Sequence, residues 1–170
     1  MKILAELTDQ NMLGLPGMSE AKPRLTARAV VRRIDGLYAV MYTGKYDFYM
    51  LPGGGVDEGE GIEEALRREI AEETGCLCGQ ITPLGVVTEN RAHADYTQIS
   101  YYFAVEAEST EIENHLTAEE LSNGISLQWH TMDEVLHLIG DPVHEVYQRR
   151  FLQARDMAAL EAYIKNGGTH

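Results

Sequence analysis

A run of glutamates follows a glycine-rich turn in the stretch LPGGGVDEGEGIEEALRREIAEETGC, residues 51–76. At an advance of about 100° per residue along a helix, Glu69, Glu72 and Glu73 share one face. That face overlaps an apolar stripe of helical spacing, formed by Ile62, Leu66 and Ile70. Carboxylate oxygens are preferred ligands of Mg²⁺, which also bridges to substrate phosphates. The pattern therefore indicates a divalent-cation site for phosphate chemistry.

A plainer interpretation is that these glutamates are surface charges on a strongly helical segment. Unpaired charge beside a buried stripe is costly, and Glu69 and Glu73 form a like-charged pair one turn apart. Arg68 is placed to pair with Glu72, which would leave Glu69 and Glu73 without a compensating charge. A bound cation would supply that charge, which favours the metal interpretation. The residues expected on the opposite, solvated side are Glu63, Glu64 and Arg67.

The elements that must position this cluster can be predicted from the hydrophobic pattern. A helix is expected from about Ile62 to Thr74, with Gly75 ending it, and a hairpin turn at Asp35–Gly36. Strands are expected in 1–9, 24–44, 76–92, 96–108 and 125–131. Loops are expected in 11–23 and 109–124, and helical segments in 132–139, from Asp141, and in 155–166. Strands and helices mix within one unit, so the expected fold class is α/β or α+β.

The composition is that of one ordinary globular domain. The chain has 170 residues, of which 44% are hydrophobic and 24% charged. Its formal net charge of −13 disfavours a nucleic-acid-coating surface but permits a phosphorylated ligand bound through cations. No apolar run approaches a membrane span and the first residues do not resemble a signal peptide, so we expect a cytoplasmic protein without membrane or nucleic-acid partners. Cys76 and Cys78 are expected to be reduced.

The stretch from Gly54 to Cys76 resembles the Nudix box, G-x5-E-x7-R-E-U-x-E-E-x-G-U, in which U is a bulky aliphatic residue. The positions in register are Gly54, Glu60, Arg68, Glu69, Ile70, Glu72, Glu73 and Gly75. Cys76 departs from the final aliphatic position, a mild change because buried cysteine behaves as a small hydrophobe. The resemblance implies a Nudix α/β/α sandwich with a mixed β-sheet, the Nudix loop-helix and C-terminal helices. We expect a single Nudix domain over 1–170, with an N-terminal strand and loop in 1–23 and C-terminal helices in 132–166.

The resemblance also implies a set of site residues, with Mg²⁺ or Mn²⁺ as cofactor. Glu72 and Glu73 are expected to bind metal, and Glu69 to bind metal or to deprotonate the attacking water. The Gly53 carbonyl should add an oxygen ligand, Arg68 should orient a glutamate and Glu60 should brace the loop. An acid from a later loop, Glu119 or Glu120, is a further candidate ligand. Candidate substrate-binding residues outside the box are Lys45, Tyr46 and Arg91.

The implied activity is metal-dependent hydrolysis of a nucleoside diphosphate linked to another moiety. Within that class, a nucleoside triphosphate and a nucleoside-diphosphate derivative such as a nucleotide sugar remain equal alternatives. Some Nudix domains only bind, so a non-catalytic nucleotide-sensing module is the alternative from another class. The intact glutamate set favours the enzyme. The sequence leaves open whether the protein is a monomer or a homodimer.

Overall fold

A computed structural model describes residues 1–108, 122–141 and 147–168 of the chain. It contains an eight-stranded sheet with the order β1-β6-β7-β2-β3-β4, in which β5 also pairs with β2 and β8 with β3. The strands are β1 (Ile3–Thr8), β2 (Arg24–Arg32), β3 (Tyr38–Thr43), β4 (Phe48–Met50), β5 (Gly53–Gly55), β6 (Leu77–Arg91), β7 (Tyr96–Glu108) and β8 (Ile125–His130). The β1–β6 and β2–β7 pairs are parallel and the other pairs are antiparallel, so the sheet is mixed.

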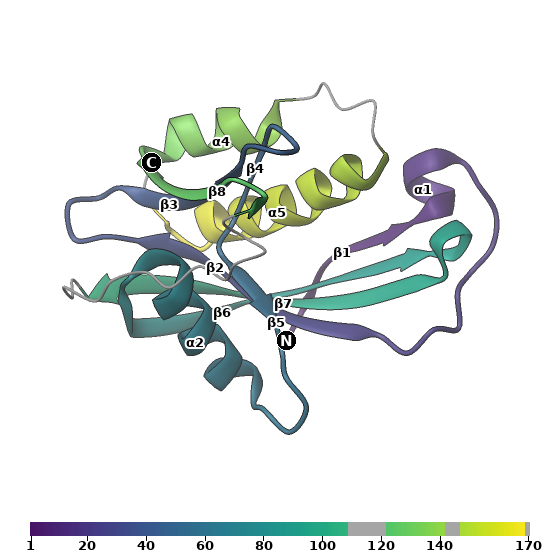
Figure 1. Ribbon diagram of the computed structural model, residues 1–170, viewed down its shortest axis with the longest axis horizontal. Coiled ribbons are helices and arrows are strands. Elements are labelled where there is room, and N and C mark those ends of the chain that lie inside the picture. The colour runs from purple at the N-terminus through teal and green to yellow at the C-terminus, as the bar shows by residue number, and fades with distance from the viewer. Residues whose placement is uncertain (109–121, 142–146, 169–170) are drawn as a thin grey trace.

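Helices cover both faces of this sheet (Figure 1). The helix α2 (Ile62–Thr74) packs on one face, where Leu66 and Ile70 join Ala27, Ala29 and Val31 of β2 in one buried cluster. The helices α4 (Met132–Gly140) and α5 (Tyr147–Lys165) lie on the other face. There Phe151 and Leu160 pack with Val30 of β2 in a second buried cluster. This arrangement confirms the predicted α/β/α sandwich.

Alternation along β2 assigns its side chains to the two faces. Because successive residues of a strand point to opposite sides, Ala27 and Ala29 face α2 while Val30 faces α5. Arg28 therefore also lies on the α5 face. The strand β2 thus contributes residues to both layers and runs beside β5, which leads into α2.

Two local expectations were wrong. A short helix, α1 (Asp9–Leu13), extends from the end of the expected strand into the predicted loop over 11–23. Thr8 and Asn11 cap it reciprocally, and Gly14 ends it with φ 71°. The segment from Asp141 and the segment 155–166 were expected as separate helices. Within the described residues, α5 runs without a break from Tyr147 to Lys165, with buried residues along it from Phe151 to Tyr163.

No helix in the described part of the chain is long and apolar enough to cross a membrane. The expected cytoplasmic location remains a prediction.

Candidate functional site

The helix α2 is anchored at both ends by glycines. Gly61 precedes it, and the Gly61 N–H donates to Glu64 Oε2 at 3.3 Å. Gly75 ends it with φ 66°, a left-handed conformation that glycine adopts without strain. Between these ends, Leu66 and Ile70 are fully buried against β2. Their burial fixes the rotation of the helix about its axis and so determines where its glutamates point.

The glycine turn before α2 admits no side chain at two positions. Gly53 has φ 125°, and a Cβ there would lie 2.2 Å from the carbonyl oxygen of Ala27 on the neighbouring β2. A Cβ on Gly54 would lie 2.4 Å from Glu69 Oε2. The Glu69 carboxylate therefore occupies the space that a side chain at position 54 would fill, and rests against the backbone of β5.

Arg68 connects the helix glutamates to the loop that precedes the helix. Its guanidinium donates to Glu69 Oε1 at 2.7 Å and to Glu72 Oε2 at 3.3 Å. On the loop side it donates to both carboxylate oxygens of Glu60 at 2.9 Å and to the carbonyl oxygen of Gly55 at 2.9 Å. One cation thus holds carboxylates from two segments and a backbone carbonyl of the glycine turn.

Glu73 is held by the backbone of the glycine turn. Its side chain is buried, and its Oε2 accepts a hydrogen bond from the Gly53 N–H at 2.6 Å. The expectation that Glu69 and Glu73 lack compensation was therefore wrong: Glu69 is paired with Arg68, and Glu73 accepts from an amide. The sequence could not show this, because the Gly53 amide approaches Glu73 only after β5 has paired with β2.

The environment of Glu69 favours its protonated form. Burial raises the pKa of its carboxyl above the usual value, and the opposing effect of Arg68 does not cancel that shift. A carboxylate of raised basicity is suited to accept a proton. The role of Glu69 in deprotonating water stays a prediction, with which this raised pKa agrees.

The pairing of Glu60 leads to a pH-dependent prediction. Hydrogen bonds from Arg68 and from the Asp57 N–H lower the Glu60 pKa from 4.5 to about 2. Because the folded-state pKa is depressed, the resulting stabilisation is complete above pH 4.5 and is lost as the pH falls toward 2. We expect the Tm difference between the parent and Glu60→Gln to be largest near neutral pH and to shrink across this window. Thermal melts from pH 7 to pH 2 measure it, and a constant difference would contradict the assignment.

The donor set of this site fits a hard divalent cation. Glu69, Glu72 and Glu73 supply carboxylate oxygens from one helix face, and the Glu69 carboxylate lies in the cradle left by Gly54. In the structure, Arg68 donates hydrogen bonds to two of these glutamates, Glu69 and Glu72. Among the described residues, no group of three Asp, Glu, His or Cys side chains is close enough together to hold a metal ion. Cation binding would therefore require the Arg68 contacts to be shared or exchanged.

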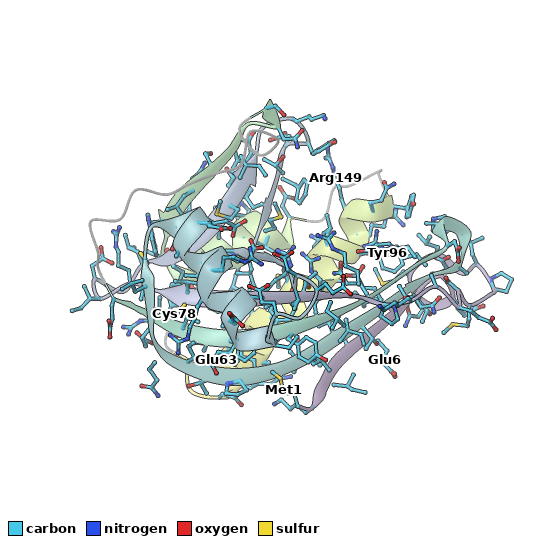
Figure 2. The ribbon with its side chains drawn as sticks, turned by 60° about the horizontal axis from the view of Figure 1, so that its bottom comes forward. Met1, Glu6, Glu63, Cys78, Tyr96 and Arg149 are labelled. Carbon is cyan, nitrogen blue, oxygen red and sulfur yellow. The ribbon has the colours of Figure 1, made fainter. Side chains whose placement is uncertain are left out.

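The other candidate residues lie apart from α2. Lys45 and Tyr46 are in the turn between β3 and β4, where Lys45 Nζ donates to Asn123 Oδ1 at 3.0 Å. Arg91 forms an ion pair with Glu89 near the end of the β6–β7 hairpin. Figure 2 shows Tyr96, the strand partner of Arg91, far along that hairpin from α2. Glu119 and Glu120 lie outside the described residues.

Sequence reasoning missed two residues that hold the segment before the glycine turn. Arg28 Nη1 donates to the carbonyl oxygen of Leu51 at 3.0 Å. The Leu51 N–H donates to Asp156 Oδ2 of α5 at 2.9 Å. Charged residues in the apolar context of β2 and α5 were a signal, because such residues are rarely buried without a reason. Their contact with Leu51 could not be predicted, since it joins three distant segments.

This fold and site define the class of the protein. The family model of the NUDIX domain matches residues 22–152, and the chain belongs to the NUDIX family. Known structures agree with the fold. A NUDIX hydrolase from Nitrosomonas europaea is similar with a TM-score of 0.65 and 23% identity over 85% of this chain and 90% of that one. A MutT NUDIX hydrolase from Burkholderia pseudomallei is similar with a TM-score of 0.54 and 24% sequence identity, over 79% of this chain and 98% of that one.

Curated relatives match over shorter lengths. An RNA pyrophosphohydrolase from Caulobacter vibrioides is 34% identical over 112 residues, which cover 59% of this chain and 65% of that protein. The nucleoside triphosphatase NudI from Escherichia coli is 62% identical over 37 residues, or 21% of this chain and 26% of that protein. The chain thus matches less than two thirds of either relative.

Proposed function

We propose that this protein is a metal-dependent pyrophosphohydrolase that cleaves a nucleoside diphosphate linked to another moiety. The observation that carries the proposal is the placement of Glu69, Glu72 and Glu73 on one helix face beside the Gly53–Gly54 turn. Such oxygen donors suit Mg²⁺ or Mn²⁺, and the membership in the NUDIX family supports the reaction class. The names of the two curated relatives, both hydrolases of phosphate anhydrides, support it further.

Each residue has a proposed task in this reaction. Glu72 and Glu73, with the carbonyl of Gly53, would hold the cation, which would neutralise phosphate charge and activate water when bound. Glu69, whose pKa burial raises, would take the proton from the attacking water. Arg68 orients Glu69 and Glu72, and Glu60 fixes Arg68 to the loop. Glu119 or Glu120 remains a proposed additional ligand.

We also propose that residues 1–170 form one domain. Leu7 of β1 and Tyr163 of α5 belong to the same buried cluster, so the first and last elements share a core.

Two substrate classes are compatible with the proposed reaction, a nucleoside triphosphate and a nucleoside-diphosphate derivative. The name of the relative NudI, a nucleoside triphosphatase, supports the triphosphate alternative. Nucleotide sugars are an example of the nucleoside-diphosphate derivatives.

A hydrolysis screen tests the proposal, in which a coupling phosphatase or pyrophosphatase converts the cleavage products to inorganic phosphate for detection. The purified protein is assayed with nucleoside triphosphates, nucleotide sugars, dinucleoside polyphosphates and triphosphorylated RNA, each with Mg²⁺ and with Mn²⁺. We expect turnover of at least one substrate, with cleavage between two phosphates. If calorimetry detects nucleotide binding while no substrate is cleaved, the alternative of a nucleotide-sensing module would be favoured instead.

A further inference from the structure

Arg28 is a half-buried cation that takes part in no ion pair among the described residues. Five other arginines with buried or half-buried side chains have carboxylate partners: Arg32 with Glu106, Arg33 with Asp35, Arg68 with Glu60, Arg91 with Glu89 and Arg155 with Asp156. A charge withdrawn from water without a partner is costly. Arg28 therefore needs an explanation that these other arginines do not.

Most of the donor capacity of Arg28 is unused within the described residues. A guanidinium carries five N–H groups. Among the described residues, Arg28 donates one side-chain hydrogen bond, from Nη1 to the Leu51 carbonyl oxygen. Its buried Nε has no acceptor among these residues. Burial and the nearby positive charge of Arg155 both lower the pKa of Arg28, so its surroundings do not favour the charge. An added anion would satisfy both the charge and the free donors.

Two carboxylates whose charges act on Arg28 do not fill this need. Glu73 and Asp156 attract Arg28 electrostatically, but each is engaged elsewhere. Glu73 accepts from the Gly53 N–H. Asp156 accepts from the Leu51 N–H, from Arg155 Nε at 2.9 Å and from the Tyr102 hydroxyl. Asp156 is thereby fixed as a partner of the backbone and of Arg155.

The position of Arg28 connects it to the candidate catalytic site. It pairs in register with Gly53, and its Cγ lies 3.0 Å from where a Cβ of Gly53 would stand. Its side chain lies on the α5 face of β2, whereas Glu73 reaches Gly53 from α2 on the other face. The guanidinium and the glutamates therefore approach the same turn from its two sides.

We propose that Arg28 binds a phosphate group of the substrate at the Gly53 turn. This inference rests on the proposed function and specifies how a strongly acidic protein accepts a polyanion there. A guanidinium presents paired N–H groups that match two phosphate oxygens, which lysine cannot reproduce. Arg28 is thus a substrate contact as well as a support for Leu51.

Binding of imidodiphosphate, a non-hydrolysable pyrophosphate analogue, tests the proposal without turnover. Calorimetry at saturating Mg²⁺ compares the parent with Arg28→Met, Arg28→Lys and the control Arg32→Met, which lies on the same strand and face. Loss of charge-assisted hydrogen bonds should weaken binding by about tenfold to a hundredfold in Arg28→Met. Arg28→Lys should be intermediate, and Arg32→Met unchanged.

Several results would overturn the inference. One is an affinity in Arg28→Met within about twofold of the parent, even with a lowered Tm, because Arg28 would then only support Leu51. If Arg28→Met does not fold, the affinity of Arg28→Lys is compared with the parent in its place, because lysine retains the charge but loses the paired donors. An affinity of Arg28→Lys within about twofold of the parent would then overturn the inference. No binding of imidodiphosphate by the parent would also overturn it.

The kinetics separate this inference from the proposed function. With a hydrolysed substrate, Arg28→Met should raise KM more than it lowers kcat, as expected for a contact made in the ground state as well. Hydrolysis by the parent with unchanged affinity and KM in Arg28→Met would overturn the inference alone. Arg28-dependent binding of imidodiphosphate, without hydrolysis of any screened substrate, would overturn the proposed function alone.

Discussion

Replacing Glu73 by glutamine is expected to lower kcat by roughly 10²–10³-fold while the protein remains folded. Loss of an anionic ligand weakens the cation's stabilisation of the transition state, which is worth several kcal/mol, and about 1.4 kcal/mol corresponds to a factor of ten. The fold should persist because the amide oxygen of glutamine can still accept from the Gly53 N–H, which Glu73 Oε2 now does at 2.6 Å. Steady-state kinetics with the best substrate of the screen, together with thermal melts, measure both effects.

Glu69→Gln and Glu72→Gln should show losses of similar size, and two matched controls should not. Glu63 and Glu64 lie on the same helix but are exposed on its other side. Glu63 pairs with the exposed Arg67 at 2.8 Å, a contact of small energy. Glu63→Gln and Glu64→Gln should therefore retain near-parental kcat. Equal losses in the two groups would show that the glutamate face of α2 has no special function.

The helix of the site could be predicted from sequence because its signals are local. The apolar spacing of Leu66 and Ile70 gave the rotation of α2, and both residues are fully buried as that spacing requires. Gly75 gave the end of the helix. The positions of Glu69, Glu72 and Glu73 relative to one another follow from the same periodicity. The fold class followed from the resemblance of the box, which the NUDIX family match confirms.

The contacts that join distant segments could not be predicted in the same way. The contacts of Leu51 with Arg28 and Asp156 join β2, the link between β4 and β5, and α5, three segments that are distant in the sequence. Arg68 illustrates the limit within a single motif: the spacing predicted its contact with Glu72, but not its shorter contacts with Glu60 and Glu69. The contact with Glu60 depends on the path of the loop before the helix, which has no periodicity.

The short helix α1 was not predicted, although the sequence contains signals for it. Thr8 and Asn11 have the spacing of a capping box and Gly14 is a typical helix end. Glycine and proline follow within a few residues in the same segment, and these residues are typical of a loop, so the segment was predicted as a loop. The helix is short, so its contribution to any periodic pattern is small.

Removal of divalent cations is expected to abolish hydrolysis completely and reversibly. Without a cation, Arg68 is the compensating charge for Glu69 and Glu72, and Glu73 is held by an amide. These contacts maintain the fold but supply no group that neutralises the phosphates. Activity should therefore fall to background in EDTA and return with Mg²⁺ or Mn²⁺ in excess of the chelator. Full turnover in EDTA would contradict the proposed mechanism.

Adding the cation back should also raise the thermal stability of the protein, and this measurement separates cation binding from catalysis. A ligand present at about 100 times its Kd stabilises the folded state by roughly 2.7 kcal/mol, and each kcal/mol raises Tm by about 2–4 °C for a domain of this size. Adding Mg²⁺ to the parent should thus raise Tm by several degrees. The rise should be smaller in Glu73→Gln, which lacks one anionic ligand, and unchanged in Glu63→Gln. If Glu73→Gln shows the full parental rise, the cation binds elsewhere, and Glu73 must affect activity by another route.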